Sequence, residues 1–141
     1  TDYVIVRTNI FGIDVNGRDF ISNIVKNLKN QKQMTGFDDI LFTPLEVSNL
    51  SEMISEIAKT DYCGIIHLSS DTFISKFQFI LQVADIFELD KSLIKKGTSE
   101  EVKFVAKRPK NLTLSNNKAK KILRTRIVPL KESLEKLRMD L

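Results

Sequence analysis

The feature that most constrains the fold lies near the start of the chain, where Val4, Ile5 and Val6 are consecutive β-branched residues. Apolar residues without polar alternation are typical of a strand covered on both faces, and such strands usually belong to parallel sheets. A parallel sheet needs neighbouring strands. The stretch begins at Tyr3 and only Thr1 and Asp2 precede it, so we expect the sheet that flanks this strand to be missing from this chain.

The remaining pattern predicts helices that alternate with short extended segments, which is typical of an α/β fold. Apolar residues at helical spacing predict helices over residues 20–30, 47–59, 75–88, 115–123 and 129–141. Short extended segments are expected within residues 31–45 and at 65–68, 93–97 and 102–105. Ser75 and Gln78 fit a capping box, and Ser115 is expected to cap the helix that follows it.

Composition excludes several classes of protein. The chain has 141 residues, 42% of them hydrophobic and 28% charged, which is the balance of one soluble globular domain. No apolar run approaches the roughly 18 residues that span a bilayer, so we expect a cytoplasmic protein without membrane contact. A lone cysteine, Cys63, and a single histidine, His67, exclude an intramolecular disulfide and a cysteine- or histidine-rich metal site. We expect Cys63 to be a small buried residue and His67 to be structural.

The positive charge gathers late in the chain. The net charge is +4, and the segment from Val102 to Pro129 holds nine basic residues and no acidic one. Such a run attracts phosphate, either in a nucleic acid or in a small nucleotide. A basic nucleic-acid-binding module at residues 103–126 is therefore an alternative. Nucleic acid is the less favoured partner, because Phe104 is the only aromatic residue there.

Few residues could carry chemistry. The five glycines are too scattered to build a phosphate-binding loop, and the adjacent Asp38 and Asp39 make a poor catalytic pair. The remaining candidate is the segment from Lys107 to Asn111. Its Arg108-Pro109 pair favours an extended backbone, and a guanidinium can bind phosphate through two parallel hydrogen bonds. The same segment also fits an ordinary solvated surface strand.

Four stretches carry a resemblance when they are taken in order. They are Val4-Ile5-Val6-Arg7-Thr8 with Phe11-Gly12, Phe37-Asp38-Asp39 with Thr43-Pro44, Gly64-Ile65-Ile66-His67-Leu68, and Ala106-Lys107-Arg108-Pro109-Lys110-Asn111-Leu112-Thr113-Leu114. Together they resemble the C-terminal part of dTDP-4-dehydrorhamnose reductases, which are extended short-chain dehydrogenase/reductases. The Arg-Pro-x-Asn-x-x-Leu piece is the most specific part of this resemblance.

The resemblance implies the C-terminal part of a Rossmann-like NAD(P)-binding fold together with the smaller substrate-binding lobe. Residues 1–141 would form one partial domain, with the cofactor-binding half absent. The parent enzyme would use NAD or NADP to reduce a 4-keto nucleotide sugar in dTDP-rhamnose biosynthesis. Neither the glycine fingerprint nor the Tyr-x-x-x-Lys pair is present, so we expect no catalytic residue here, no tight cofactor binding and no activity.

The resemblance also implies where ligands bind. Asn9, Phe11, Arg108 and Asn111 are expected to contact the nucleotide sugar, and Thr8 the cofactor. This chain has Asn9-Ile10, Ile40 and Leu45 where the family commonly has other residues. The resemblance therefore does not indicate which sugar the substrate carries. A non-catalytic relative, such as the regulatory subunit of methionine adenosyltransferase, is a further alternative. The missing neighbours of the first strand predict self-association through an exposed sheet edge.

Overall fold

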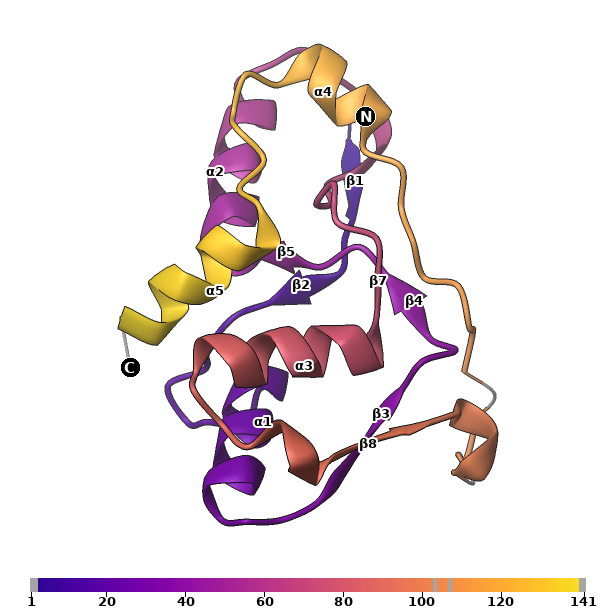
Figure 1. The fold of residues 1–141 in the computed structure, drawn as a ribbon. Helices are drawn as coiled ribbons and strands as arrows, with labels where there is room; N and C mark the ends of the chain where they lie inside the picture. The colour runs from indigo at the N-terminus through magenta and orange to yellow at the C-terminus, as the bar shows by residue number, and fades with distance from the viewer. Residues whose placement is uncertain (1–2, 103, 107, 140–141) are drawn as a thin grey trace.

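The computed structural model describes residues 3–102, 104–106 and 108–139 of the chain. Eight short strands are interspersed with five α-helices and two 3-10 turns (Figure 1). The strands are β1 Val4–Arg7, β2 Ile10–Phe11, β3 Met34–Phe37, β4 Leu41–Phe42, β5 Leu45–Glu46, β6 Gly64–His67, β7 Ile74–Ser75 and β8 Ile94–Gly97. The helices are α1 Phe20–Lys29, α2 Val47–Ile57, α3 Lys76–Ile86, α4 Asn117–Ile122 and α5 Leu130–Met139, and the 3-10 turns are η1 Lys91–Leu93 and η2 Ser99–Glu101.

The first strand is part of a parallel pair, as its sequence predicts. β1 pairs with β6 in a register that places Val4 opposite Gly64 and Arg7 opposite His67. One face of this pair packs on α2 and α4, in the upper part of Figure 1. We call the cluster there the Ile66 core, and it consists of Leu45, Leu50, Met53, Ile57, Ile66, Leu68, Ala119 and Leu123.

The apolar sequence of β1 is typical of a strand covered on both faces, but among the described residues one face is open, as expected if its neighbouring strands are missing. Ile5 is 45% exposed and Ile65 is 42% exposed, and they lie side by side in the register of β1 and β6. β1 has no second strand partner among the described residues, and no described helix buries this face. The apolar sequence of the strand therefore leaves an open hydrophobic face.

A second core fills the lower part of the molecule in Figure 1, where α1, α3 and α5 pack around Phe79. We call it the Phe79 core, and it consists of Phe11, Ile21, Ile24, Val25, Leu28, Phe42, Ile74, Phe79, Ile80, Val83, Ala84, Ile94, Leu130, Leu134 and Leu137. β3 runs parallel to β8 and lies close to α3. A Cβ atom at Gly36 would lie 2.7 Å from the Cα atom of Phe77, so only glycine allows this approach.

The start of α3 is fixed by the predicted capping box. The Gln78 backbone N–H donates to the Ser75 hydroxyl, and the Ser75 N–H donates to the Gln78 side chain, both at 3.1 Å. Ser75 also belongs to β7, which pairs antiparallel with β4. This junction holds the first turn of α3 against β4.

Three local predictions are wrong. The predicted strand at 102–105 is absent, because the backbone after η2 bends and Phe104 N–H donates to the Val102 carbonyl oxygen, while Lys103 lies outside the described residues. Asn116 precedes α4 in place of Ser115, since the backbone of Asn116 accepts the first helical hydrogen bond from Lys120. Cys63 is exposed, because the loop before β6 runs over the surface.

Candidate functional site

A large apolar hollow lies between the start of α3, β3 and the segment that follows η2. We call it the Arg108 cavity; its volume is about 620 Å³, and its lining residues are Phe20, Met34, Thr35, Phe37, Ile40, Lys76, Ile80, Phe104, Arg108, Pro109 and Leu112. Its walls are aromatic and aliphatic, and among the described residues its charged side chains are Lys76 and Arg108, which are both cationic. A cavity of this kind suits a flat apolar ligand that carries negative charge.

Aromatic side chains support Arg108 in the wall of the cavity. Its guanidinium carbon lies 5.6 Å from the centre of the Phe104 ring, and Phe104 meets Phe37 edge to face with 5.9 Å between ring centres. Among the described residues no carboxylate forms an ion pair with Arg108. The guanidinium can therefore bind an anion without breaking an ion pair to a described residue.

The segment that carries Arg108 is tied to β4 by backbone hydrogen bonds. Leu41 N–H donates to the Lys110 carbonyl oxygen, and Leu112 N–H donates to the Leu41 carbonyl oxygen, both at 2.8 Å. Asn111 therefore lies in an isolated parallel bridge with Leu41. Its side-chain oxygen accepts from the backbone and hydroxyl of Thr113, which closes a local turn.

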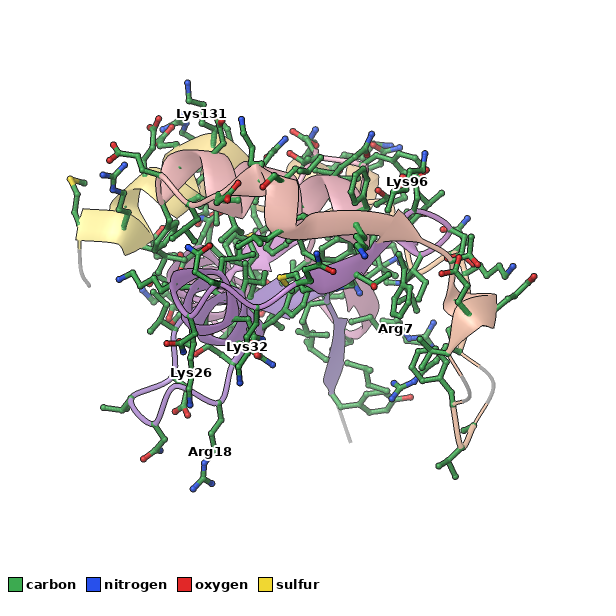
Figure 2. All side chains as sticks on the ribbon, turned by 60° about the horizontal axis from the view of Figure 1, so that its bottom comes forward. Arg7, Arg18, Lys26, Lys32, Lys96 and Lys131 are labelled. Carbon is green, nitrogen blue, oxygen red and sulfur yellow. The ribbon has the colours of Figure 1, made fainter. Side chains whose placement is uncertain are left out.

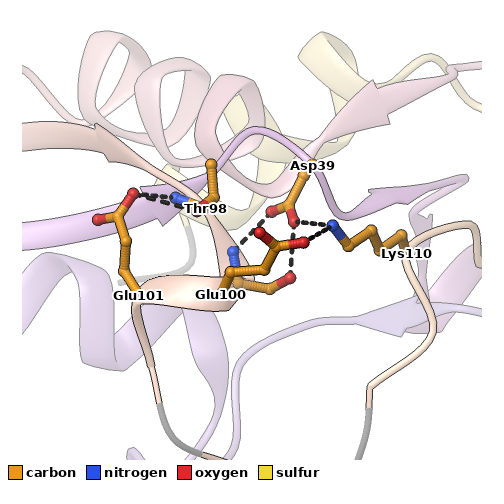
Figure 3. A network of polar contacts seen from close by, with 6 residues as sticks. Asp39, Thr98, Glu100, Glu101 and Lys110 are labelled. Atoms are coloured by element: carbon orange, nitrogen blue, oxygen red, sulfur yellow. Dashed lines mark hydrogen bonds and ion pairs between the residues drawn. The ribbon is translucent and has the colours of Figure 1, made fainter.

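A polar network anchors the same segment to η2 (Figure 3). The Ser99 backbone N–H and hydroxyl donate to the two carboxylate oxygens of Asp39, at 2.8 and 2.6 Å. Lys110 Nζ lies 2.6 Å from Glu100 Oε1 and 3.3 Å from Asp39 Oδ2. The Ser99 hydroxyl and backbone and the Lys110 ammonium all lower the pKa of Asp39, because each stabilises the carboxylate.

The adjacent Asp38 and Asp39 therefore bind different neighbouring residues. Asp38 accepts from the Ser75 hydroxyl at 2.9 Å and pairs with Lys96 at 2.6 Å, whereas Asp39 turns toward Ser99 and Lys110. Both carboxylates are already engaged.

The Asp39 network makes a pH-dependent contribution to stability. We expect Asp39→Asn to lower the melting temperature by a few degrees at neutral pH, because the amide cannot pair with Lys110. Since the pKa of Asp39 is lowered in the fold, its contribution is present above the ordinary aspartate pKa of about 3.9 and is lost below it. Thermal melts from about pH 7 down to about pH 3 should show the variant and the unmutated chain converging. Asp61→Asn, at an exposed loop position, is the control, and an equal loss there would contradict this role.

The other predicted site residues lie apart from the Arg108 cavity. Asn9 supports the chain between β4 and β5: its side-chain oxygen accepts from Thr43 N–H at 3.2 Å, and the Thr43 hydroxyl accepts from Leu114 N–H. Phe11 is 5% exposed in the Phe79 core and lines a separate hollow of about 360 Å³ with Phe20. The Thr8 hydroxyl is buried and has no hydrogen-bond partner among the described residues.

Comparison with known proteins shows the family to which this chain belongs. The model of the RmlD substrate binding domain matches residues 1–141, which is the whole chain. The chain belongs to this family. The match includes both cores, the Arg108 cavity and the basic stretch at 103–126. A comparison with curated proteins gave no match.

Solved structures share the fold. A dTDP-4-dehydrorhamnose reductase from Bacillus anthracis, in complex with NADP, matches 99% of this chain and 49% of its own with a TM-score of 0.87 and 23% identity. A hypothetical dTDP-4-dehydrorhamnose reductase from Sulfolobus tokodaii matches 93% of this chain and 46% of its own, with a TM-score of 0.77 and 30% identity. A dTDP-glucose 4,6-dehydratase from Bacillus anthracis, in complex with NAD, matches 96% of this chain and 43% of its own, with a TM-score of 0.76 and 13% identity. This family member therefore spans about half the length of the solved proteins it resembles, and its fold is the Rossmann-like α/β fold that its sequence predicts.

The alternative readings gain no support from these comparisons. Among the described basic residues of the stretch 103–126, Lys110, Lys120 and Arg126 are paired with acidic side chains, so the stretch is less cationic in space than in sequence. Figure 2 shows other cations on opposite sides of the molecule, with Lys131 on one side and Arg18 on the other.

No helix within the described part of the chain is long and apolar enough to cross a membrane. The described residues also contain no group of three or more histidine, cysteine or carboxylate side chains that could hold a metal ion. The Arg108 cavity combines apolar walls with cationic side chains.

Proposed function

We propose that this chain is the nucleotide-sugar-binding part of an NAD(P)-dependent reductase of the dTDP-4-dehydrorhamnose type. The observation that carries the proposal is the Arg108 cavity, an apolar hollow of about 620 Å³ with two cationic groups, in a member of a substrate-binding family. Solved structures of similar fold are enzymes of dTDP-sugar chemistry, which supports the choice of ligand.

The cavity has an aromatic part that fits the base of a nucleotide and a cationic part that fits its phosphates. The rings of Phe20, Phe37 and Phe104 offer apolar faces to a planar base. Arg108 has a planar fork of donors that matches a phosphate, and its aromatic support limits the side-chain entropy that binding would cost. We therefore assign the base to the aromatic wall and the diphosphate to Arg108.

The remaining predicted residues are assigned to the other end of the ligand. Asn9 lies at the end of β1, and we propose that it and Phe11 lie on the sugar side of the site. Asn111 holds the backbone of the Arg108 segment, so we assign it an indirect part in binding. The Thr8 hydroxyl is buried without a hydrogen-bond partner in the described part of the chain, which supports its assignment to the cofactor side.

The chemistry itself is assigned to a cofactor-binding half that precedes β1 in the parent enzyme. The residues present here do not form a dinucleotide site alone, because no glycine-rich turn joins a strand to a helix. We propose that the parent is an oxidoreductase that uses NAD or NADP. The chain alone should bind its nucleotide sugar and show no turnover.

Calorimetry tests this proposal directly. Titration with dTDP-rhamnose and with dTDP should give saturable heat with dissociation constants of about 0.1–1 mM, because one half of a binding site gives weak affinity. Free rhamnose, which lacks the base and the phosphates, should give none. Absence of heat with both nucleotides would overturn the assignment.

The open face of β1 and β6 supports the prediction of self-association. Ile5 and Ile65 form an exposed apolar pair beside an unpaired strand edge, and such surfaces favour contact between copies. Ile65→Lys should shift the population toward monomer in light scattering at micromolar concentrations. Val15→Lys, at a fully exposed turn residue, should leave the population unchanged. A monomeric unmutated chain across this range would contradict the prediction.

A further inference from the structure

Lys76 is a partly buried cation that lies against aromatic rings. It is the first residue of α3 and lines the same cavity as Arg108. Its Nζ atom lies 3.4 Å from the centre of the Phe42 ring and 5.1 Å from the centre of the Phe20 ring. Among the described residues no hydrogen-bond acceptor or carboxylate pairs with this ammonium, so its close contacts are aromatic faces.

The surroundings of Lys76 disfavour its charge. Burial lowers its pKa to about 8. The carboxylates on the neighbouring elements are engaged elsewhere, since Asp19 caps α1 through Ser22, and Asp38 accepts from Ser75 and pairs with Lys96. The nearby Arg108 is also cationic, and the positive end of α3 lies at Lys76 itself. Among the described residues, no negatively charged group pairs with the Lys76 ammonium.

We propose that Lys76 is a second anion-binding residue of the Arg108 cavity, which together with Arg108 selects ligands that carry a diphosphate over uncharged ligands of the same shape. This inference rests on the proposed function, because it places the diphosphate of a nucleotide between the two cations. A bound diphosphate supplies the missing counter-charge. Each charge-assisted hydrogen bond of this kind contributes more than a neutral one.

Binding of an anion is expected to be coupled to protonation of Lys76. Near pH 8 about half of the Lys76 side chains are neutral in the free chain, and a bound diphosphate favours the charged form. Binding should therefore take up about half a proton at pH 8, and affinity should fall as the pH rises from 8 toward 9.5. No described acidic side chain lines the cavity to compete for this proton.

The test uses Lys76→Met and Lys76→Arg, with inorganic pyrophosphate, dTDP and thymidine as probes. Calorimetry at pH 7 should show that Lys76→Met binds dTDP and pyrophosphate about 10- to 100-fold more weakly, while Lys76→Arg stays near the unmutated affinity. Thymidine should bind all three chains equally. Titrations at pH 8 in buffers of different ionisation enthalpy should show the proton uptake in the unmutated chain and its loss in Lys76→Met.

Folding does not confound this comparison. Methionine matches the length of the lysine stem and removes the cost of a buried charge, so Lys76→Met should melt at or above the temperature of the unmutated chain at pH 7. If Lys76→Met and the unmutated chain bind dTDP and pyrophosphate with equal affinity, the role of Lys76 is overturned, but the nucleotide assignment is not. If dTDP fails to bind while pyrophosphate still depends on Lys76, the nucleotide assignment falls and the anion site stands.

Discussion

Replacing Phe79 with alanine is expected to destabilise the chain by about 3–5 kcal/mol, a large fraction of the stability of a domain of this size. Phe79 is fully buried, and its ring centre lies 5.3, 5.4 and 5.8 Å from those of Phe42, Phe11 and Phe20. Alanine would leave a cavity at the point where α1, α3, β2 and β4 meet. Urea unfolding followed by circular dichroism measures the loss.

The matched control for this substitution is Phe73→Ala. Phe73 precedes β7 and is 61% exposed, so its truncation removes the same atoms from a site that water already reaches. We expect a change of less than about 0.5 kcal/mol there. Equal effects at Phe73 and Phe79 would contradict the assignment of Phe79 to the centre of the core.

Replacing Arg108 with alanine is expected to weaken dTDP-rhamnose binding by about 10- to 100-fold, because a charge-assisted pair with phosphate contributes about 1.5–3 kcal/mol. Arg108 makes no ion pair with a described carboxylate, so its loss should leave the melting temperature nearly unchanged. Calorimetry and a thermal melt on the same sample separate these two effects.

Two further variants sharpen the Arg108 prediction. Arg108→Lys keeps the charge and loses the planar fork, so it should fall between the unmutated chain and Arg108→Ala. Arg18→Ala removes an arginine that points outward from the turn before α1 (Figure 2) and should not change binding. An unchanged affinity in Arg108→Ala would remove the phosphate assignment.

Much of the fold follows from local sequence signals. The β-branched run at Val4–Val6 predicts a strand in a parallel pair, and the Ser75–Gln78 box predicts the start of α3. These predictions succeed because they depend on residues that are close together in the chain. The β-branched run by itself predicts a covered strand, and the exposure of Ile5 is expected only when the neighbours of that strand are taken to be missing.

The site is harder to predict than the fold. Arg108 is indicated by its proline-stiffened segment, but Lys76 reads as an ordinary first residue of a helix. Its burial depends on Phe20 and Phe42, which reach it from α1 and β4 through tertiary packing. A lysine between Ile74 and the aromatic Phe77 is a local signal that could have drawn attention to it. The Asp39 network likewise joins residues 60 positions apart.

The most direct test of the account is a methyl NMR titration of the chain with dTDP-rhamnose. Met34, Ile40 and Ile80 line the Arg108 cavity, whereas Met53 and Ile66 lie in the Ile66 core and serve as internal controls. Binding in the cavity predicts saturable shifts of the first three methyl groups, with the two control methyl groups unchanged. Shifts confined to the Ile66 core, or none at any concentration, would contradict the assignment of this cavity to the nucleotide.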